Sequence, residues 1–177
     1  MKRTIVFIII IASVSLYSCS TGSEKMSGEI TKMESEMKST QKVDSVVVIE
    51  LLSAYQNFNS KYPGDSLSPE YLYRAAALAA GFNRGTQAID LYESIIHTYP
   101  EYKRIPECYF MEAFTYENTL ENIGKADELY KQFLAKYPNH ELADDAHAAI
   151  KFLGKSPEEM VREFEKMKAD SEKIVNR

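Results

Sequence analysis

The segment AIDLYESIIHTYP at residues 88–100 returns as ADELYKQFLAKYP at residues 126–138. A third copy, LLSAYQNFNSKYP at residues 51–63, keeps the closing Tyr-Pro and the residue types before it. Residues five, eight and twelve places before each proline are apolar or aromatic, and these spacings place them in one stripe along a helix. Because a proline disfavours helical backbone at the residue before it, each helix ends at its Tyr-Pro. The chain is therefore a helical repeat whose prolines are 37 and 38 residues apart.

Further helices begin at a fixed distance after each Tyr-Pro. Pro69 and Pro106 both lie six residues after a repeat proline, and both precede a glutamate. A proline in the first turn with an acidic neighbour suits the unpaired N–H groups and the positive end of a helix. Ser68 is the expected N-cap of the first of these helices. Together the patterns predict helices over residues 43–61, 69–83, 86–98, 106–120, 123–136, 141–153 and 157–173, with a weaker one over 24–39.

The junction between the last two predicted helices carries two local signals. Gly154 is placed to end the first of them as a C-terminal cap. Ser156 and Glu159 have the spacing of a capping box, which starts the second. That second helix is highly charged and has only a narrow apolar stripe, the pattern of a helix that closes a solenoid. The stripe consists of Val161, Phe164 and Met167.

The repeat resembles the tetratricopeptide repeat (TPR), a helix pair with a large apolar residue, two small ones, an aromatic residue and a closing proline. In one unit these positions fall on Leu72, Ala76, Ala88, Tyr92 and Pro100. The resemblance implies an all-α, right-handed solenoid of antiparallel helix pairs with a C-terminal capping helix. It covers residues 43–153, although the first unit matches only in its second helix.

The resemblance also implies which residues pack the helices of a pair together. A small residue on each helix allows a close crossing, and a larger side chain there costs about 1–3 kcal/mol. The predicted packing residues are Ala76, Ala88, Tyr92, Ala113, Ala126 and Tyr130.

The N-terminus has the pattern of a secretory signal. A basic start precedes an apolar run over residues 5–14, which is shorter than the ~20 residues that span a bilayer. Leu16-Tyr17-Ser18-Cys19 resembles the lipobox of bacterial lipoproteins, with Tyr17 as a departure from its small residue. The resemblance implies cleavage after Ser18 and lipidation of Cys19. We therefore expect a signal peptide over residues 1–18, a lipidated tether with a weak helix over 19–42, in which 20–28 form a flexible stalk, and a TPR-like domain over 43–177.

Composition excludes several functions. A formal net charge of −5 argues against nucleic acid as a partner, because phosphate binding requires a basic face. The 2 cysteines cannot supply a structural zinc site. If Cys19 carries lipid, Cys108 is left alone in an apolar helical run, where a buried hydrophobic role is favoured over a catalytic thiol.

No motif for catalysis or phosphate binding is present. His140, Asp144 and His147 share one helical face and could hold a divalent metal, but an ordinary surface helix is the favoured explanation. We predict no catalytic, cofactor or metal residue, and hence no enzyme.

The resemblance points to recognition of protein partners. TPR solenoids bind partner segments on a concave face built mainly from the first helices, where this chain carries interface-prone side chains. We predict a partner groove formed by Tyr73, Arg74, Phe110 and Phe114, with the alternative that Phe110 and Phe114 pack against a neighbouring unit.

The whole chain is similar to small TPR lipoproteins of the Bacteroidetes, and more distantly to BamD-like assembly lipoproteins and YbgF-like periplasmic proteins. This similarity implies a lipid-anchored adaptor on the inner leaflet of the outer membrane, facing the periplasm and serving outer-membrane protein assembly. A scaffold for peptidoglycan synthesis or cell division is an alternative, which a trimeric coiled coil over residues 24–39 would support. A metal-binding or hydrolytic envelope protein is a third, without a motif.

Overall fold

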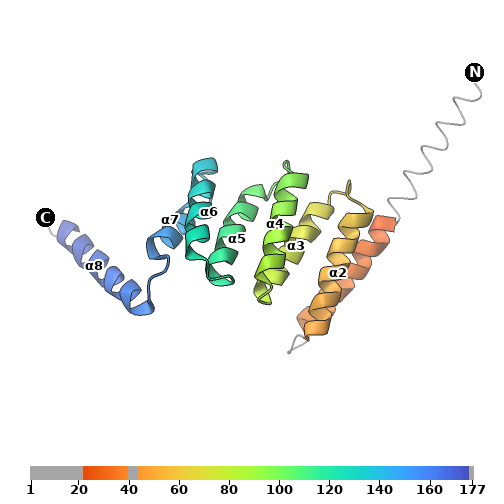
Figure 1. Ribbon diagram of the computed structural model, residues 1–177, viewed down its shortest axis with the longest axis horizontal. Helices are drawn as coiled ribbons and strands as arrows, with labels where there is room; N and C mark the ends of the chain where they lie inside the picture. The colour runs from red at the N-terminus through yellow and green to blue at the C-terminus, as the bar shows by residue number, and fades with distance from the viewer. Residues whose placement is uncertain (1–21, 40–43, 176–177) are drawn as a thin grey trace, which may run out of the picture. The chain divides into compact units, whose positions relative to one another are not determined.

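The computed structural model describes residues 22–39 and 44–175, and over these residues the chain is helical without any strand (Figure 1). The predicted all-α, TPR-like fold is confirmed, and each predicted helix is found within about three residues of its expected bounds. The signal peptide and Cys19 lie outside the described residues. After the helical segment 22–39, the elements are α2 (Ser45–Lys61), α3 (Ser68–Gly81), α4 (Gly85–Thr98), α5 (Ile105–Asn118), α6 (Ile123–Lys136), α7 (Ala143–Phe152) and α8 (Pro157–Val175).

The chain divides into two compact units, Met1–Ile105 and Pro106–Arg177, which are described separately. Within the described ranges, no helix has both the length and the apolar character needed to cross a bilayer.

The three Tyr-Pro segments close their helices with one backbone geometry. The amide of each tyrosine donates to a carbonyl four residues earlier, from Tyr62 to Phe58, from Tyr99 to Ile95 and from Tyr137 to Phe133. Each tyrosine carbonyl then accepts from the amide three residues later, and that residue's carbonyl accepts from the third residue beyond it. These repeated bonds satisfy carbonyl groups that a helix end leaves open. The proline that stops the helix therefore begins a loop of fixed shape, which leads directly into the next helix.

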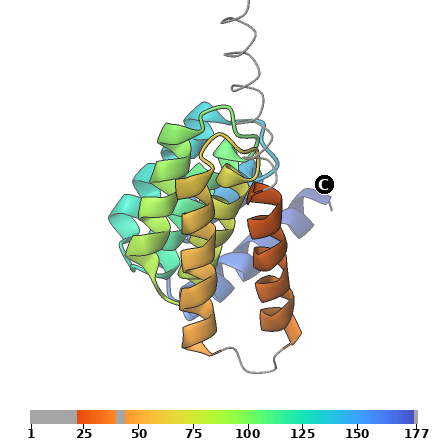
Figure 2. The ribbon, with the colours of Figure 1, turned by 90° about the vertical axis from the view of Figure 1, so that its right-hand side faces the viewer.

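The segment 22–39, which the sequence predicted only as a weak helix, is a packed helix of unit 1. The segment 22–39 runs beside α2, as Figure 2 shows, and buries Ile30 completely. Its Ser27 hydroxyl lies 2.7 Å from the hydroxyl of Tyr71 on α3. The predicted flexible stalk over residues 20–28 is therefore wrong from residue 22 onward, because burial of Ile30 and the contact with Tyr71 hold this segment as a helix.

The start of this segment is fixed by a close approach. A Cβ atom added at Gly22 would lie 2.6 Å from the hydroxyl oxygen of Tyr62, so a larger residue would force the tyrosine ring to move. Tyr62 itself packs on Phe58, with ring centroids 5.3 Å apart. The first Tyr-Pro tyrosine thus lies against the beginning of the first described helix.

Ser68 does not cap α3 as predicted. The helix begins one residue earlier than expected, its N-cap is Leu67, and no side chain caps it. The fully buried Ser68 instead donates from its hydroxyl to the Tyr62 carbonyl at 2.6 Å. Because Ser68 already lies inside the helix, its hydroxyl bonds the end of α2 rather than the start of α3.

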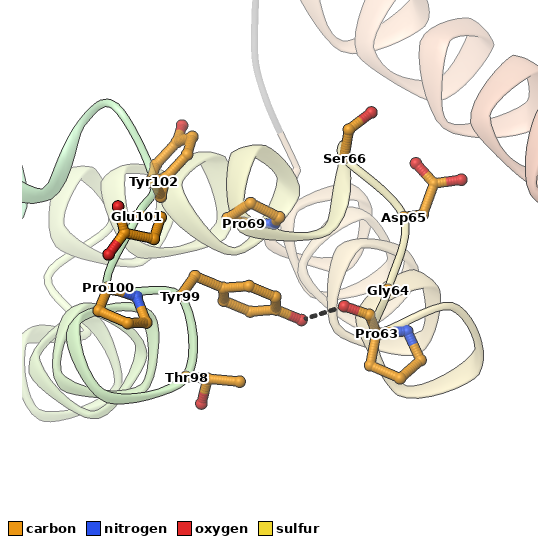
Figure 3. Close-up of a pocket in the computed structure, with 10 residues that line it drawn as sticks. All are labelled: Pro63, Gly64, Asp65, Ser66, Pro69, Thr98, Tyr99, Pro100, Glu101 and Tyr102. Atoms are coloured by element: carbon orange, nitrogen blue, oxygen red, sulfur yellow. Dashed lines mark hydrogen bonds between the residues drawn. The ribbon is translucent and has the colours of Figure 1, made fainter.

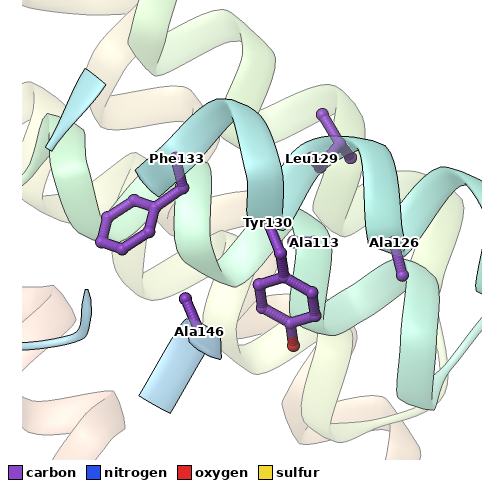
Figure 4. Close-up of a cluster of buried hydrophobic side chains, with 6 residues drawn as sticks. All are labelled: Ala113, Ala126, Leu129, Tyr130, Phe133 and Ala146. Atoms are coloured by element: carbon purple, nitrogen blue, oxygen red, sulfur yellow. The ribbon is translucent and has the colours of Figure 1, made fainter. Parts of the chain in front are cut away.

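Unit 2 is built on α5, α6 and α7 around one apolar cluster (Figure 4). Its members come from all three helices and are all buried. They are Ala113, Ala126, Leu129, Tyr130, Phe133 and Ala146.

The junction from α7 to α8 follows the sequence signals. Gly154 has φ of +70°, a conformation that suits glycine just past a helix end. Ser156 and Glu159 form the predicted capping box: the Ser156 amide donates to Glu159 Oε2 at 2.8 Å, and the Glu159 amide donates to Ser156 Oγ at 3.2 Å. α8 contacts α7 through Phe164, whose ring stacks on Phe152 at 4.9 Å. Val161 remains 55% exposed, so the apolar stripe of the expected capping helix is only partly covered.

Candidate interaction site

Tyr73 on α3, the first predicted groove residue, is buried within unit 1. Its ring meets the edge of Tyr92, with centroids 5.8 Å apart. The Arg104 guanidinium lies over the same ring, 3.6 Å from its centroid. A cation over an aromatic face is attracted by the ring quadrupole. Tyr73 therefore supports the α3 surface, and Arg104 covers it.

Arg74 is the exposed one of the two predicted groove residues on α3. Its Nη1 lies 2.9 Å from Glu34 Oε1, and its Nε lies 3.0 Å from Glu70 Oε1. The side chain is 43% exposed, so the two ion pairs are partly screened by water. Arg74 thus joins the segment 22–39 to α3 and still presents its guanidinium at the surface.

Glu70 is the centre of this charged group. It accepts from Arg74 and from the Tyr102 hydroxyl, the latter at 2.6 Å, and Arg104 Nη1 lies 3.8 Å away. Burial alone would raise the pKa of Glu70, but the bonds from Tyr102 and Arg74 and the nearby guanidinium groups outweigh it and lower that pKa below its usual value. The carboxylate is therefore a fixed acceptor that ties the loop after α4 to α3.

The other two groove residues lie on α5 in unit 2. Phe110 packs edge-on against Tyr130 and Phe133, at centroid distances of 5.5 and 5.7 Å. Phe114, one turn later, is 43% exposed. Phe110 thus belongs largely to the packing of its own unit, whereas Phe114 offers an aromatic surface. A groove shared by all four residues would draw on both units and stays a prediction.

Sequence reasoning missed the carboxylate and the cation that hold the α3 face. Glu34 lies in a helix whose sequence pattern is weak, and Arg104 lies at the end of the loop between α4 and α5. Arg74 and Glu34 are 40 residues apart in the chain, so no local sequence pattern predicts their hydrogen bond.

The residues predicted to pack the helix pairs are all buried. Ala76, Ala88, Ala113 and Ala126 have no exposed surface, and the same holds for Tyr92 and Tyr130. Tyr130 also donates to Glu117 Oε2 at 2.7 Å. Because protein interiors are close-packed, a larger side chain at these buried positions would have to displace its neighbours.

The three residues considered as metal ligands do not form a metal-binding group in the described part of the chain. His140 precedes α7, where its Nδ1 accepts from the Leu142 amide at 3.2 Å, while Asp144 and His147 are exposed on α7 itself. Among residues 22–39 and 44–175, no group of three or more His, Cys, Asp or Glu side chains is placed to hold a metal ion. Cys108 is fully buried in α5.

A comparison with protein-family models assigns the repeats. The model described as tetratricopeptide repeat matches residues 70–102 and 107–140, which cover all but the first two residues of the pairs α3–α4 and α5–α6. No curated protein matches the chain. These two segments are thus similar to TPR repeats, and stacked repeats of that kind form surfaces for protein–protein interaction.

Proposed function

We propose that the protein is a lipid-anchored, periplasm-facing TPR adaptor that binds protein partners during outer-membrane protein assembly. The observation that carries this proposal is the pair of TPR repeats over residues 70–140, in a chain that begins with a signal-like segment and a lipobox-like Leu16–Cys19. The repeats support the adaptor role, and the N-terminal pattern supports the anchor and the envelope location.

The helix at residues 22–39 changes the expected geometry of the anchor. Two residues lie between Cys19 and Gly22, and the three residue steps from one to the other span at most about 11 Å when fully extended. Gly22 lies against Tyr62, beside the first Tyr-Pro loop. A lipid on Cys19 would therefore hold this end of unit 1 close to the membrane surface, rather than on a long stalk.

Each unit is proposed to offer its own partner contact, Arg74 in unit 1 and Phe114 in unit 2. A partly exposed guanidinium and an exposed aromatic ring are side chains that contribute most strongly to protein interfaces. Tyr73 and Phe110 instead make contacts within their own units, Tyr73 under the Arg104 guanidinium and Phe110 against Tyr130.

The alternative role in peptidoglycan synthesis or division has no specific support in the structure. The segment that would form its coiled coil buries Ile30 within unit 1 and bonds to α3 through Glu34.

The anchor is tested by labelling cells with an alkyne-bearing fatty acid. The full chain should carry the label, Cys19→Ala should lose it and stay in the signal-bearing form, and Cys108→Ala should keep it as the matched control. Label retained by the Cys19→Ala variant would remove the anchor from the proposal.

The adaptor role is tested by photocrosslinking in cells. A photoreactive residue replaces Arg74 or Phe114, and the exposed Ser94 and Ala135 serve as controls in the same units. We expect the first two positions to capture envelope-assembly proteins that the controls do not. Identical captures at all four positions would contradict the proposed surface, and capture of division proteins alone would favour the alternative role.

A further inference from the structure

A cleft of about 400 Å³ lies between two Tyr-Pro loops of unit 1 (Figure 3). One wall is the loop 63–66, the other is the segment 98–102, and Pro69 at the start of α3 lies between them. Tyr73 and Arg74 do not line it. The cleft is thus a surface separate from the face of α3 that carries Tyr73 and Arg74.

The aromatic rings of the cleft are held by bonds to the protein itself. The Tyr99 hydroxyl contacts Asn59 Oδ1 and donates to the Pro63 carbonyl at 3.0 Å, which fixes the ring across the cleft (Figure 3). The Tyr102 hydroxyl donates to Glu70. Because these hydroxyl groups are already bonded, the tyrosines offer their rings to a ligand. Pro63, Pro69 and Pro100 extend this apolar surface.

All of the charge in the cleft lining is negative. Asp65 and Glu101 are the charged side chains among the ten lining residues, and they stand on opposite sides of the Tyr99 ring in Figure 3. Asp65 uses Oδ1 to accept from the Leu67 amide at 2.9 Å, which leaves its second oxygen available. Glu101 makes no hydrogen bond or ion pair with any residue in the described part of the chain. Both acids can therefore accept from a ligand.

We propose that this cleft binds an extended partner segment in which one lysine or arginine is flanked by proline or other apolar residues. The cationic head would pair with either Asp65 or Glu101, which flank the Tyr99 ring, since charge-assisted hydrogen bonds to carboxylates are strong. The aliphatic stem and the apolar neighbours would lie on the rings of Tyr99 and the prolines, as long cationic side chains do on apolar surfaces. A cleft of this volume lies within the range of about 300–1,000 Å³ that is usual for ligand pockets.

The inference rests on the proposed adaptor function only in taking a protein segment as the ligand, and it names the chemistry of one such segment. Its test therefore uses defined peptides and the purified full chain in detergent. The lipid-labelling and crosslinking experiments above can fail or succeed independently of it.

The probe is fluorescein-labelled Gly-Leu-Pro-Lys-Pro-Leu, with peptides that carry norleucine or glutamate in place of the lysine as comparisons. Binding is followed by fluorescence anisotropy. We expect the lysine peptide to bind at least about tenfold more tightly than the norleucine peptide, and this ratio to fall as salt is raised from 50 to 500 mM, because exposed charge pairs are screened.

Matched variants locate the binding. Asp65→Asn with Glu101→Gln should bring the lysine peptide to the affinity of the norleucine peptide. Asp90→Asn with Glu93→Gln, which removes the same charge from exposed positions on α4 outside the cleft, should leave the ratio unchanged.

Three outcomes would overturn the proposal. They are equal or undetectable binding of the lysine and norleucine peptides, the same loss in both double variants, or a change in sedimentation mass caused by the Asp65 and Glu101 substitutions. The last result would assign the cleft to contacts between copies of this chain.

Discussion

Tyr130 donates a hydrogen bond of 2.7 Å to the carboxylate of Glu117 from a ring that is completely buried. Tyr55 on α2 is the equivalent residue in the pair formed by α2 and the segment 22–39. It donates to Glu34 at the same distance. The aromatic position of the repeat therefore does more than fill space. In these two places it delivers a phenol to a glutamate on the partner helix and joins the two helices of a pair.

Removal of the Tyr130 hydroxyl should weaken unit 2. In Tyr130→Phe the ring still fills its space, but the partly buried Glu117 loses its donor, so we expect the free energy of unfolding to fall by about 1–3 kcal/mol. Glu117→Gln keeps an acceptor and should cost less. Urea unfolding of both single variants and the double variant measures the coupling between the two residues. Strictly additive losses would show that the bond contributes nothing.

The same tyrosines make stability sensitive to alkaline pH. Burial, followed by the adjacent carboxylates, raises the pKa of Tyr55 and Tyr130 well above the usual value of about 10. The folded chain therefore keeps these protons after the unfolded chain begins to lose them. Stability is fully present below about pH 10 and falls as the pH rises further.

The measurement is urea unfolding from pH 8 to pH 11. Tyr55→Phe with Tyr130→Phe should lower stability at pH 8 but flatten its decline above pH 10. Parallel declines in the double variant and the unaltered chain would contradict the assignment.

The acid side of the profile should depend on Glu70. Although burial opposes it, the bonds from Tyr102 and Arg74 and the nearby guanidinium groups lower the pKa of Glu70. A group of this kind stabilises the fold above the ordinary carboxyl pKa of about 4.3, and that stabilisation is lost as the pH falls below it.

Glu70→Gln should therefore be less stable than the unaltered chain at pH 7, and the two unfolding curves should approach each other near pH 3. Glu93→Gln, an exposed carboxylate on α4, is the control and should change neither end of the profile. A constant difference between Glu70→Gln and the unaltered chain from pH 7 to pH 3 would mean that the charge of Glu70 is irrelevant.

The repeat pattern predicted the helices because their signals are local. A stripe at helical spacing and a Tyr-Pro stop define each end within the same 15 residues or so. The sequence predicts the segment 22–39 only weakly as a helix, because Ile30 is its only fully buried apolar residue. The tyrosine–glutamate bond that joins it to α2 also connects residues further apart in the chain than the equivalent bond in unit 2. Glu34 and Tyr55 are 21 residues apart, whereas Glu117 and Tyr130 are 13 apart. The family match accordingly begins only at residue 70.

The charged group around Arg74 could not be predicted for a different reason. Its bonds join residues that are far apart in the chain, such as Arg74 to Glu34 and Tyr102 to Glu70, and no periodicity relates them. Ser68 shows that residue type alone does not fix the exact first residue of a helix. Its residue type favours an N-cap, but the loop geometry places it inside α3, where its hydroxyl bonds the Tyr62 carbonyl.

The small residues at the helix crossings should not tolerate enlargement. Ala76 has no exposed surface, whereas Ala77 next to it on α3 is exposed. Ala76→Leu adds three carbon atoms to a filled core and should cost about 1–3 kcal/mol, while Ala77→Leu should change stability by less than about 0.5 kcal/mol. Thermal unfolding followed by circular dichroism separates them. Equal melting temperatures for the two variants would contradict a close crossing at Ala76.

The capping box should control the C-terminal helix without controlling the whole fold. The Glu159 amide donates to Ser156 Oγ, so Ser156→Ala leaves that amide without its cap and should cost α8 about 0.5–2 kcal/mol. Because α8 contacts α7 through Phe164 and Met167 and pairs with the junction through Glu163, this loss should appear as local opening. Hydrogen exchange of the α8 amides should therefore become about 2- to 30-fold faster, while exchange in α5 and α6 stays unchanged. Ser156→Thr preserves the hydroxyl and should restore most of the protection, whereas faster exchange throughout unit 2 would show that α8 is an integral part of its core.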